Sequence, residues 1–578
     1  MEIVNLIIDG LNVTTPKGTT VLAAARQAGI EIPTLCFLKD VNEVASCRVC
    51  VVELNSKLIA SCTLIAEEGM NISTNTPMIR EARKTVVELL LSNHKRECTT
   101  CIRSECCELQ QLCKDLNIRD IRYEGEKNSG KMDLSSCSIV RDDEKCILCG
   151  RCIKTCCDIQ SVHAINFSHR GFNTKVSPLY ERPLGDTTCI NCGQCIMACP
   201  VGALYEKENI KDVWNVLADK NKYVVVQTAP AVRIALGEEF GLPIGTRVTG
   251  KMVAALRKLG FYQVFDTDFA ADLTIMEEGT ELLSRLNSGE KLPLMTSCCP
   301  AWVKFVEHNY TNMLPNLSTC KSPHEMEGAL IKTYFAEKLG IDAEKIVVVS
   351  IMPCVAKKFE GQRQELGTAS MKNIDYVLTT RELSTMIKEA GIDFPNMKAE
   401  DFDNPFGEST GAGVIFGTTG GVTEAALRTV FDIISGDDNS LMEVHTVRGI
   451  SGIKEMSIRL PDGRTINAAI ANGIRNAREV LESIQSRKKH YDFIEVMACP
   501  GGCVTGGGQP ILNSRIKEKI DPKLERAKSI YEEDSSKLIR KSHKNPYILK
   551  IYEEFLIKPN STLSHELLHT HYLARNDK

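Results

Sequence analysis

The stretch Met497-Ala-Cys-Pro-Gly-Gly-Cys-Val-Thr-Gly-Gly-Gly-Gln-Pro510 holds two cysteines, Cys499 and Cys503, among five glycines. The residues before it, 491–496, are largely apolar, which predicts a buried strand. The cysteines therefore stand where a strand ends and a loop begins, the position at which open α/β sheets place their sites. Glycine lets the backbone approach a bulky ligand closely. Two thiolates in such a loop indicate a metal cluster.

Two other stretches also place cysteine at the end of a strand. Leu294-Met-Thr-Ser-Cys-Cys-Pro-Ala-Trp302 follows a short apolar run, and Ile346-Val-Val-Val-Ser-Ile-Met-Pro-Cys354 is a predicted buried strand that ends in cysteine. Together with the first stretch they offer four thiolates for one [4Fe-4S] cubane.

These stretches and the residues directly beside them form the patterns TSCCPxW (296–302), MPCxxKxxE (352–360) and ExMxCxxGCxxGGGQP (495–510). These resemble the three signature motifs of [FeFe]-hydrogenases, and they occur in the family's order and at its wide separations. The resemblance extends over essentially the whole chain and is similar to the large clostridial-type enzymes with accessory iron–sulfur clusters. It implies an oxidoreductase that interconverts protons, electrons and H2.

By this resemblance the catalytic centre is an H-cluster, in which Cys299, Cys354, Cys499 and Cys503 hold a [4Fe-4S] cubane. Cys503 also bridges to a two-iron subcluster that carries CO, cyanide and a dithiolate amine. Maturation proteins are expected to make that subcluster. The iron carries out the bond chemistry, whereas the protein supplies orientation, electrostatics and protons.

The residue before the first ligand, Cys298, cannot easily share the same cubane. A thiol there has a tunable pKa and can pass protons to the bridging amine, and the family uses this position as its first proton relay. Without the resemblance, nearby carboxylates such as that of Glu278 would be interpreted as part of a solvated helix face. Glu277 is adjacent to Glu278, so the choice between these two residues rests on the resemblance. The remaining carriers that the resemblance implies are Glu278, Ser318 and Glu281, with Arg285 near the outlet.

Other residues beside the cysteines fit a dry pocket for anionic diatomic ligands. Lys357 offers a cation that can hydrogen-bond cyanide, and Glu360, at helical spacing, can hold the lysine in place. Met352 and Met497 are soft, apolar side chains that suit the cavity, although without the resemblance ordinary core packing is favoured. By the same resemblance, Pro230 lines the cyanide site from the other side.

The composition excludes several classes of protein. The 578 residues are too many for one core, so several domains are expected. A net charge of -4 implies no nucleic-acid partner, and no apolar run reaches the length of a membrane span. The 25 cysteines cluster in CxxC units without a secretion signal, so we expect metal ligands in a cytoplasmic protein.

Residues 1–78 are predicted to form a β-grasp domain, similar to plant-type ferredoxins, with one [2Fe-2S] cluster. The cysteines follow the spacing C-x10-C-x2-C-x11-C, whose first interval is longer than in plant ferredoxins. That spacing resembles the cysteine spacing of [FeFe]-hydrogenases and of the large iron–sulfur subunit of respiratory complex I. A structural zinc site is the alternative to the [2Fe-2S] cluster. The predicted ligands are Cys36, Cys47, Cys50 and Cys62.

Residues 79–125 contain the pattern H-x3-C-x2-C-x5-C. By spacing alone this set suits zinc as well as iron. Its position resembles that of the histidine-ligated [4Fe-4S] module of the same two families. Cys106 and Cys113 are expected to be packed bystanders. The predicted ligands are His94, Cys98, Cys101 and Cys107.

Residues 126–208 carry the pattern C-x2-C-x2-C-x3-C twice, as two-cluster bacterial ferredoxins do. The last cysteine of each run serves the other cluster, so we expect two [4Fe-4S] clusters here and three accessory [4Fe-4S] clusters in all. Cys157 stands where proline is usual, and Cys137 has no predicted role. The two predicted ligand sets are Cys146, Cys149, Cys152 and Cys199, and Cys189, Cys192, Cys195 and Cys156.

In residues 209–578 strand-like runs alternate with helical patterns, which predicts a large, two-lobed α/β H-cluster domain with mainly parallel sheets. The complete chain is thus an α+β multidomain protein. Near its end, His565, His569 and His571 have metal-like spacing, but a surface helix is the favoured interpretation. Cys320 is a further thiol without a predicted role.

The accessory clusters have full ligand sets, so they are expected to conduct electrons rather than bind substrate. The predicted partner is ferredoxin or another low-potential electron carrier. The alternative is that the chain is the catalytic subunit of an NAD(P)H-linked hydrogenase. A histidine at the position of His324 resembles the family members that work in such assemblies. The chain lacks a clear GxGxxG unit, so nicotinamide chemistry would lie on another subunit. A non-catalytic H2 sensor or iron–sulfur assembly protein is a third alternative, and Cys298 argues against it.

Overall fold

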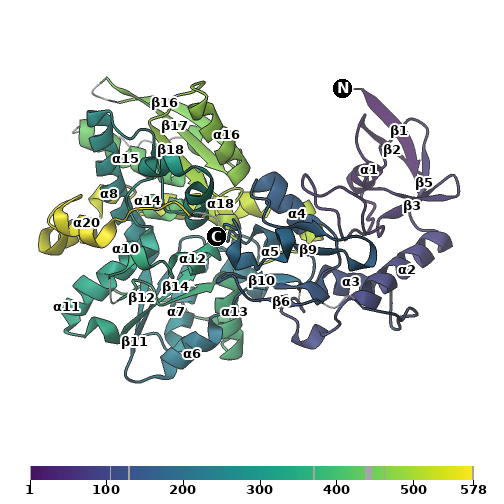
Figure 1. Cartoon of the computed structure of the whole chain (residues 1–578), viewed down its shortest axis with the longest axis horizontal. Helices are drawn as coiled ribbons and strands as arrows, with labels where there is room; N and C mark the ends of the chain where they lie inside the picture. The colour runs from purple at the N-terminus through teal and green to yellow at the C-terminus, as the bar shows by residue number, and fades with distance from the viewer. Residues whose placement is uncertain are drawn as a thin grey trace.

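The structure of the chain is a computed structural model that describes residues 2–104, 106–127, 130–368, 371–435, 445–460 and 463–575. Figure 1 shows the N-terminal part extending to one side of a larger body that is formed by the rest of the chain. No helix among the described residues is long and apolar enough to cross a membrane.

The first domain comprises β1 (Ile3–Ile8), β2 (Leu11–Pro16), α1 (Val21–Gln27), β3 (Val51–Leu54), β4 (Lys57–Ala60) and β5 (Asn71–Ser73). Its strands lie in the order β2-β1-β5-β3-β4, and only the β1–β5 pair is parallel. Every second residue of β1 is buried, because successive side chains of a strand point to opposite faces. The sheet thus has one face available for packing.

A second region contains the two repeated cysteine runs. It comprises α2 (Pro77–Asn93), α3 (Glu108–Asp115), β6 (Met132–Asp133), β7 (Ile139–Asp142), α4 (Arg151–Lys154), β8 (Asn166–Ser168), β9 (Lys175–Ser177), α5 (Gln194–Ala198) and β10 (Leu204–Glu206). The short helices α4 and α5 begin after Gly150 and Gly193, whose φ angles are 79° and 72°. The two cysteine runs therefore fold alike.

The large domain contains two four-stranded sheets. The first, in the order β12-β11-β14-β15, is entirely parallel, and the second, β13-β18-β17-β16, has one antiparallel pair at its β16 edge. All seven residues of β14 are buried, as a strand covered on both faces requires. The strands are β11 (Tyr223–Thr228), β12 (Gln263–Asp266), β13 (Leu294–Met295), β14 (Ile346–Met352), β15 (Tyr376–Thr379), β16 (Ile453–Arg459), β17 (Thr465–Asn472) and β18 (Phe493–Met497).

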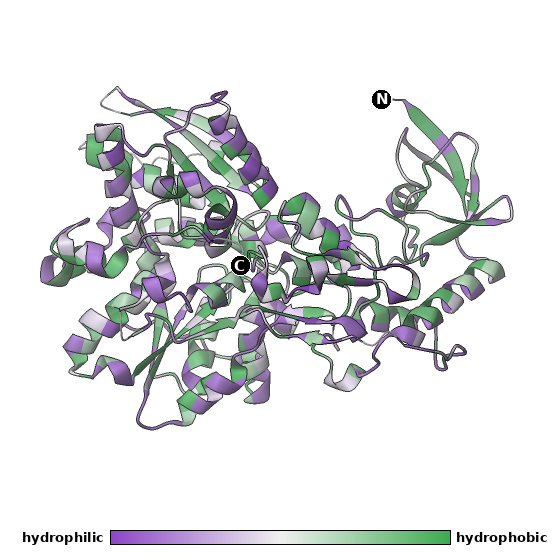
Figure 2. Cartoon of the chain, in the orientation of Figure 1, coloured by the Kyte–Doolittle hydropathy of each residue, from purple (hydrophilic) through white to green (hydrophobic). Residues whose placement is uncertain are grey.

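Helices surround both sheets. They are α6 (Ile210–Ala218), α7 (Thr249–Leu259), α8 (Thr267–Ser288), α9 (Pro300–Asn309), α10 (Pro323–Leu330), α11 (Ala336–Leu339), α12 (Ala356–Glu360), α13 (Thr380–Glu389), α14 (Gly411–Val414), α15 (Gly421–Ser435) and α16 (Ile474–Gln485). Figure 2 shows hydrophobic residues along the central strands, whereas the helices carry both hydrophobic and hydrophilic residues. The longest of these helices, α8, contacts α10, α14 and α15, and it brings its carboxylates close to the site.

The C-terminal segment packs into the large domain rather than trailing from it. It comprises α17 (Ser514–Lys519), α18 (Pro522–Ser536), α19 (Pro546–Ile551) and α20 (Thr562–Leu568). Arg428 Nη2 lies 2.9 Å from Asp534, and Arg526 Nη2 lies 2.6 Å from Glu238. The paired side chains are at most 3% exposed, so removing one partner would leave an uncompensated charge in the interior.

Candidate active site and cluster cavities

Strand ends from both sheets of the large domain meet at one cavity. The loops that follow β11, β13, β14 and β18 all open into it, and the carboxyl ends of parallel strands are where such sheets place their sites. Most of the site residues predicted for this domain line the cavity: Pro230, Cys298, Cys299, Met352, Cys354, Lys357, Met497, Cys499 and Cys503.

The donor set of this cavity fits an iron–sulfur cluster. Cys299, Cys354, Cys499 and Cys503 are free cysteines from three separate segments. Burial raises the pKa of each thiol, to about 12 for Cys354, and neighbouring thiolates raise it further at Cys354, Cys499 and Cys503. Four thiolates are therefore compatible with this cavity only around a cationic group. The loop is tight enough to need glycine, because Gly502 has φ 100° and a Cβ there would lie 2.6 Å from a backbone nitrogen.

The ferredoxin-like region contacts this cavity through Gln194. Its Nε2 donates to Cys499 Sγ at 3.2 Å and to the Thr505 carbonyl oxygen at 3.0 Å. The backbones also approach closely, since a Cβ on Gly507 would lie 2.5 Å from the carbonyl oxygen of Cys192. A hydrogen bond thus connects an accessory cysteine run to a cysteine of the central cavity.

Two further cavities enclose the repeated cysteines. Burial again raises the pKa of these thiols, for instance to about 12 for Cys146 and Cys156. Cys157 and Cys137 line neither cavity, and Cys137 Sγ instead accepts from Asn191 Nδ2 at 3.8 Å. The first cavity is lined by Cys146, Cys149, Cys152 and Cys199, and the second by Cys156, Cys189, Cys192 and Cys195.

In the first domain the four predicted cluster ligands are buried together. The amide N–H of Cys36 donates to Cys47 Sγ, and that of Cys47 donates to Cys36 Sγ, both at 3.4 Å. The side chains of Cys50 and Cys62 are hydrogen-bonded to each other. Four buried thiols of this kind suit a [2Fe-2S] cluster or a zinc ion.

His94 is buried at the C-terminal end of α2. Within the described part of the chain its Nδ1 is buried and has no hydrogen-bond partner, which fits an atom that binds a metal. The thiolates of Cys101 and Cys98 contribute to the raised pKa of Cys107, which burial mainly causes. Cys106 differs, because its sulfur accepts from Arg103 Nη1 at 3.8 Å.

Lys357 is held at the wall of the central cavity. Its Nζ donates to the Cys298 carbonyl oxygen at 3.1 Å and to Glu360 Oε2 at 2.6 Å. Glu360 Oε2 also lies 2.7 Å from His324 Nε2, and His324 Nδ1 lies 3.0 Å from Ser350 Oγ. Burial and the Lys357 cation lower the pKa of His324 to about 4. Burial opposes ionisation of Glu360, but Lys357 and His324 outweigh it and lower the pKa of Glu360 to about 2.

Glu278 is close enough to Cys298 to influence the ionisation of the thiol. Burial, and then the Glu278 carboxylate, raise the pKa of Cys298 well above its ordinary value. Burial also raises the pKa of Glu278 to about 8, in spite of its hydrogen-bonding contact with Ser318. A carboxyl group with this pKa gains and loses protons near neutrality.

Glu281 continues this chain of polar groups towards solvent. Its Oε2 accepts from Ser318 Oγ at 3.0 Å, and its Oε1 accepts from Arg285 Nη2 at 2.5 Å. Arg285 also donates to the carbonyl oxygens of residues 315–317, which fixes the guanidinium. Ser318 is thus a hydrogen-bonding neighbour of both carboxyl groups.

Glu277 belongs to a different network. It accepts from Tyr552 Oη at 2.6 Å, from the Asn560 amide at 2.7 Å and from His569 Nε2 at 3.2 Å, all in the C-terminal segment. The surface interpretation of the three C-terminal histidines is therefore wrong for His569, whose side chain is only 3% exposed, whereas His565 is exposed. The chain returns there to pair with the backbone at Cys320, which buries the imidazole.

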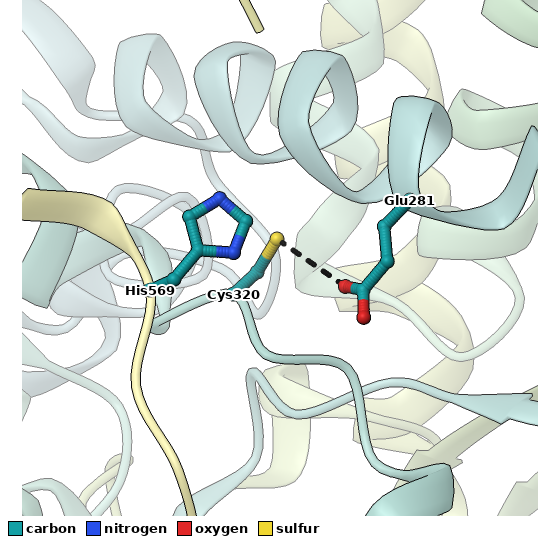
Figure 3. A group of neighbouring side chains, drawn as sticks. All are labelled: Glu281, Cys320 and His569. Atoms are coloured by element: carbon teal, nitrogen blue, oxygen red, sulfur yellow. Dashed lines mark hydrogen bonds between the residues drawn. The ribbon is translucent and has the colours of Figure 1, made fainter. Parts of the chain in front are cut away.

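Two features of the site were missed by the sequence interpretation. Gln194 carried no prediction, although its place inside a cysteine run was a usable signal. The contact of Cys320 with Glu281 Oε2, at 3.9 Å, and the placement of His569 beside them had no sequence signal, because these residues lie far apart in the chain. Figure 3 shows the three side chains together.

Comparisons with known proteins agree with this site. Residues 222–507 match the model "Iron only hydrogenase large subunit, C-terminal domain", and residues 519–575 match "Iron hydrogenase small subunit". Residues 2–77 match a 2Fe-2S iron-sulfur cluster binding domain, 83–122 an NADH-ubiquinone oxidoreductase-G iron-sulfur binding region and 186–205 a 4Fe-4S binding domain.

Two individual relatives match the whole chain or nearly all of it. It is 48% identical to the NADP-reducing hydrogenase subunit HndD of Solidesulfovibrio fructosivorans, with 100% of both chains covered. It is 40% identical to iron hydrogenase 1 of Clostridium pasteurianum, covering 98% of this chain and 99% of that one. A solved variant of the [FeFe]-hydrogenase HydA1 from Chlamydomonas reinhardtii superposes with a TM-score of 0.56 at 40% identity, over 64% of this chain and 99% of that chain.

Proposed function

Because this chain belongs to the iron-only hydrogenases, which are oxidoreductases, we propose that it reduces protons to H2 reversibly at an H-cluster in the central cavity. The observation that carries the proposal is the convergence of four cysteines from three segments on one buried cavity, beside Cys298 and Lys357. Cys299, Cys354, Cys499 and Cys503 would hold the cubane, with Cys503 as the bridge. When bound, the H-cluster supplies the iron chemistry that makes and breaks the H–H bond.

The protein's part at the cavity is to present charge and exclude water. Lys357 Nζ is fixed by Glu360 and by the Cys298 carbonyl oxygen, so its positive charge faces the cavity without rearrangement. His324 anchors Glu360 in turn, and its lowered pKa keeps the imidazole neutral. Pro230, Met352 and Met497 contribute apolar walls, where anionic ligands gain more from Lys357 than they would in water.

Protons reach the cavity through a chain of side chains. Glu281, at the outer end beside Arg285, exchanges a proton with solvent, and Ser318 Oγ links it to Glu278. Glu278 holds a proton on its carboxyl group at neutral pH and delivers it to Cys298 Sγ, which faces the cavity. The hydrogen bonds of Glu277 support Glu278 as the proton carrier of the two adjacent glutamates, because the Glu277 carboxylate is bound by residues of the C-terminal segment.

Electrons travel through the accessory domains. The proposed set is one [2Fe-2S] cluster on Cys36, Cys47, Cys50 and Cys62, one [4Fe-4S] cluster on His94, Cys98, Cys101 and Cys107, and two [4Fe-4S] clusters in the ferredoxin-like cavities. The hydrogen bond from Gln194 to Cys499 supports an entry point from the ferredoxin-like region into the central cavity.

The electron partner is proposed to be ferredoxin or a similar low-potential carrier in the cytoplasm. A second candidate is an NAD(P)H-oxidising subunit, favoured by the full-length similarity to a subunit of an NADP-reducing hydrogenase and by His324. Pull-down of the purified chain with each candidate separates the two. Maturation proteins would supply the two-iron subcluster.

The test of the proposed function is H2 evolution from reduced viologen by anaerobically purified protein that has been loaded with a preformed two-iron cofactor. Iron is counted in the same sample. Rapid evolution at full occupancy is the expected result. No evolution at full occupancy, with the CO and cyanide infrared bands present, would refute catalysis and favour a sensor.

A further inference from the structure

Three potential metal ligands meet at the outer end of the proposed proton path. Glu281 extends from α8, Cys320 lies in the loop before α10, and His569 follows α20 (Figure 3). One ligand atom of each lies within 4.8 Å of the other two. Figure 3 shows the imidazole and the carboxylate on opposite sides of the Cys320 sulfur. None of these residues belongs to the cluster cavities.

Hydrogen bonds to neighbouring residues orient the side chains of Glu281 and His569 for metal binding. The carboxylate of Glu277 can only accept, so His569 Nε2, 3.2 Å away, carries the ring proton. Nδ1 then carries a lone pair and accepts a hydrogen bond from Thr319 Oγ1 at 2.8 Å. Histidines that bind metals are oriented in this way, by donating the other ring N–H to a carboxylate. Glu281 is also held in place, since Arg285 donates to its Oε1 at 2.5 Å, whereas its Oε2 faces the thiol and accepts from Ser318 Oγ at 3.0 Å and from the Thr319 amide at 3.1 Å.

The spacing of these atoms suits zinc. Cys320 Sγ and Glu281 Oε2 are 3.9 Å apart, and two such ligands on a tetrahedral zinc ion are about 3.5 Å apart, given zinc–sulfur and zinc–oxygen bonds of about 2.3 and 2.0 Å. This pair needs to close by only a few tenths of an ångström, and the ligand atom of His569 lies within 4.8 Å of both. A set of one thiolate, one imidazole and one carboxylate disfavours magnesium and calcium, which bind oxygen ligands.

We propose that Glu281, Cys320 and His569 bind Zn²⁺ and that the bound ion blocks the outer end of the proton path. On binding, Cys320 releases its thiol proton to solvent as the zinc–sulfur bond forms. Glu281 Oε2 is the atom that accepts from Ser318 Oγ, so an ion on that oxygen breaks the path between Ser318 and Glu281. The blocking half of this inference rests on the proposed function, whereas the zinc site does not.

The test titrates the loaded, active enzyme with zinc chloride alone in a chelator-free buffer. Viologen-linked H2 evolution is measured together with bound zinc per chain and with iron content, which must stay constant. We expect inhibition in step with binding of one zinc ion. Zinc-edge X-ray absorption should show one sulfur at about 2.3 Å and nitrogen or oxygen at about 2.0 Å.

Variants identify the ligands. Cys320→Ser and His569→Gln lie outside the proton path and should keep the uninhibited rate, but the zinc concentration for half-inhibition should rise at least tenfold. Glu277→Gln should weaken zinc binding by about 10–100-fold through loss of the orienting carboxylate. His565→Gln is the matched control, because the ring centroid of His565 lies 4.1 Å from that of His569 but His565 lies outside the ligand group. It should be inhibited like the parent enzyme.

Two results would overturn the inference. One is equal zinc affinity in the parent, Cys320→Ser and His569→Gln enzymes. The other is stoichiometric zinc binding at this site with undiminished H2 evolution. Failure of the proposed function would look different, because the enzyme would then evolve no H2 before zinc is added, while the bound zinc of parent and variants would still decide whether the site exists.

Discussion

Replacing Gln194 with leucine should lower the reduction potential of the cubane in the central cavity. The side chain donates to Cys499 Sγ at 3.2 Å inside a buried environment. A hydrogen bond to a charged acceptor contributes about 1.5–3 kcal/mol, and it favours the reduced cluster because that state carries more negative charge on sulfur. If about 1 kcal/mol of this distinguishes the two redox states, the potential falls by about 40 mV, since a tenfold change corresponds to 59 mV for one electron.

The assay is a redox titration of the loaded enzyme, followed by the CO and cyanide infrared bands and by electron paramagnetic resonance. Gln160→Leu is the matched control. Gln160 is also a buried glutamine of the ferredoxin-like region, but its Nε2 donates to the carbonyl oxygen of Ala498 at 2.8 Å, not to sulfur. The reasoning is refuted if Gln194→Leu leaves the potential unchanged, or if Gln160→Leu shifts it equally.

Three further predictions concern the central cavity. Cys298→Ala should assemble all clusters yet lose about 10²–10⁴-fold in H2 evolution, since a positioned proton donor is missing; normal turnover at full iron content would contradict the relay. Cys503→Ser should fail to retain the two-iron unit, which is seen as loss of the CO and cyanide infrared bands, and their persistence would argue against the bridge. Burial raises the pKa of Glu278 to about 8, so proton reduction should decline as pH rises through about 8, where the carboxyl group stays ionised. Glu278→Gln should be slow at every pH, and a parent-like pH profile in that variant would remove Glu278 from the path.

The sequence could predict cluster-binding segments because the expected ligands of each cluster are local. Cys146, Cys149 and Cys152 lie within one turn-and-helix unit, so their spacing alone constrains the geometry. The choice between Glu277 and Glu278 was not predictable from the residues themselves. Adjacent residues on a helix point about 100° apart, and only packing against the C-terminal segment shows which one faces Cys298.

The sequence by itself determined the chemistry of this protein, namely the thiolate sets, the glycine loop and the three cysteine motifs, because these depend on residue types at short and regular spacing. It also indicated the family, since those motifs are specific and occur together in the family's order. Only the tertiary structure decided which groups meet across long separations. Gln194 donates a hydrogen bond to Cys499, 305 residues away in the sequence, and His569 hydrogen-bonds Glu277, 292 residues away. Such contacts arise from the packing of whole domains, which no local pattern encodes.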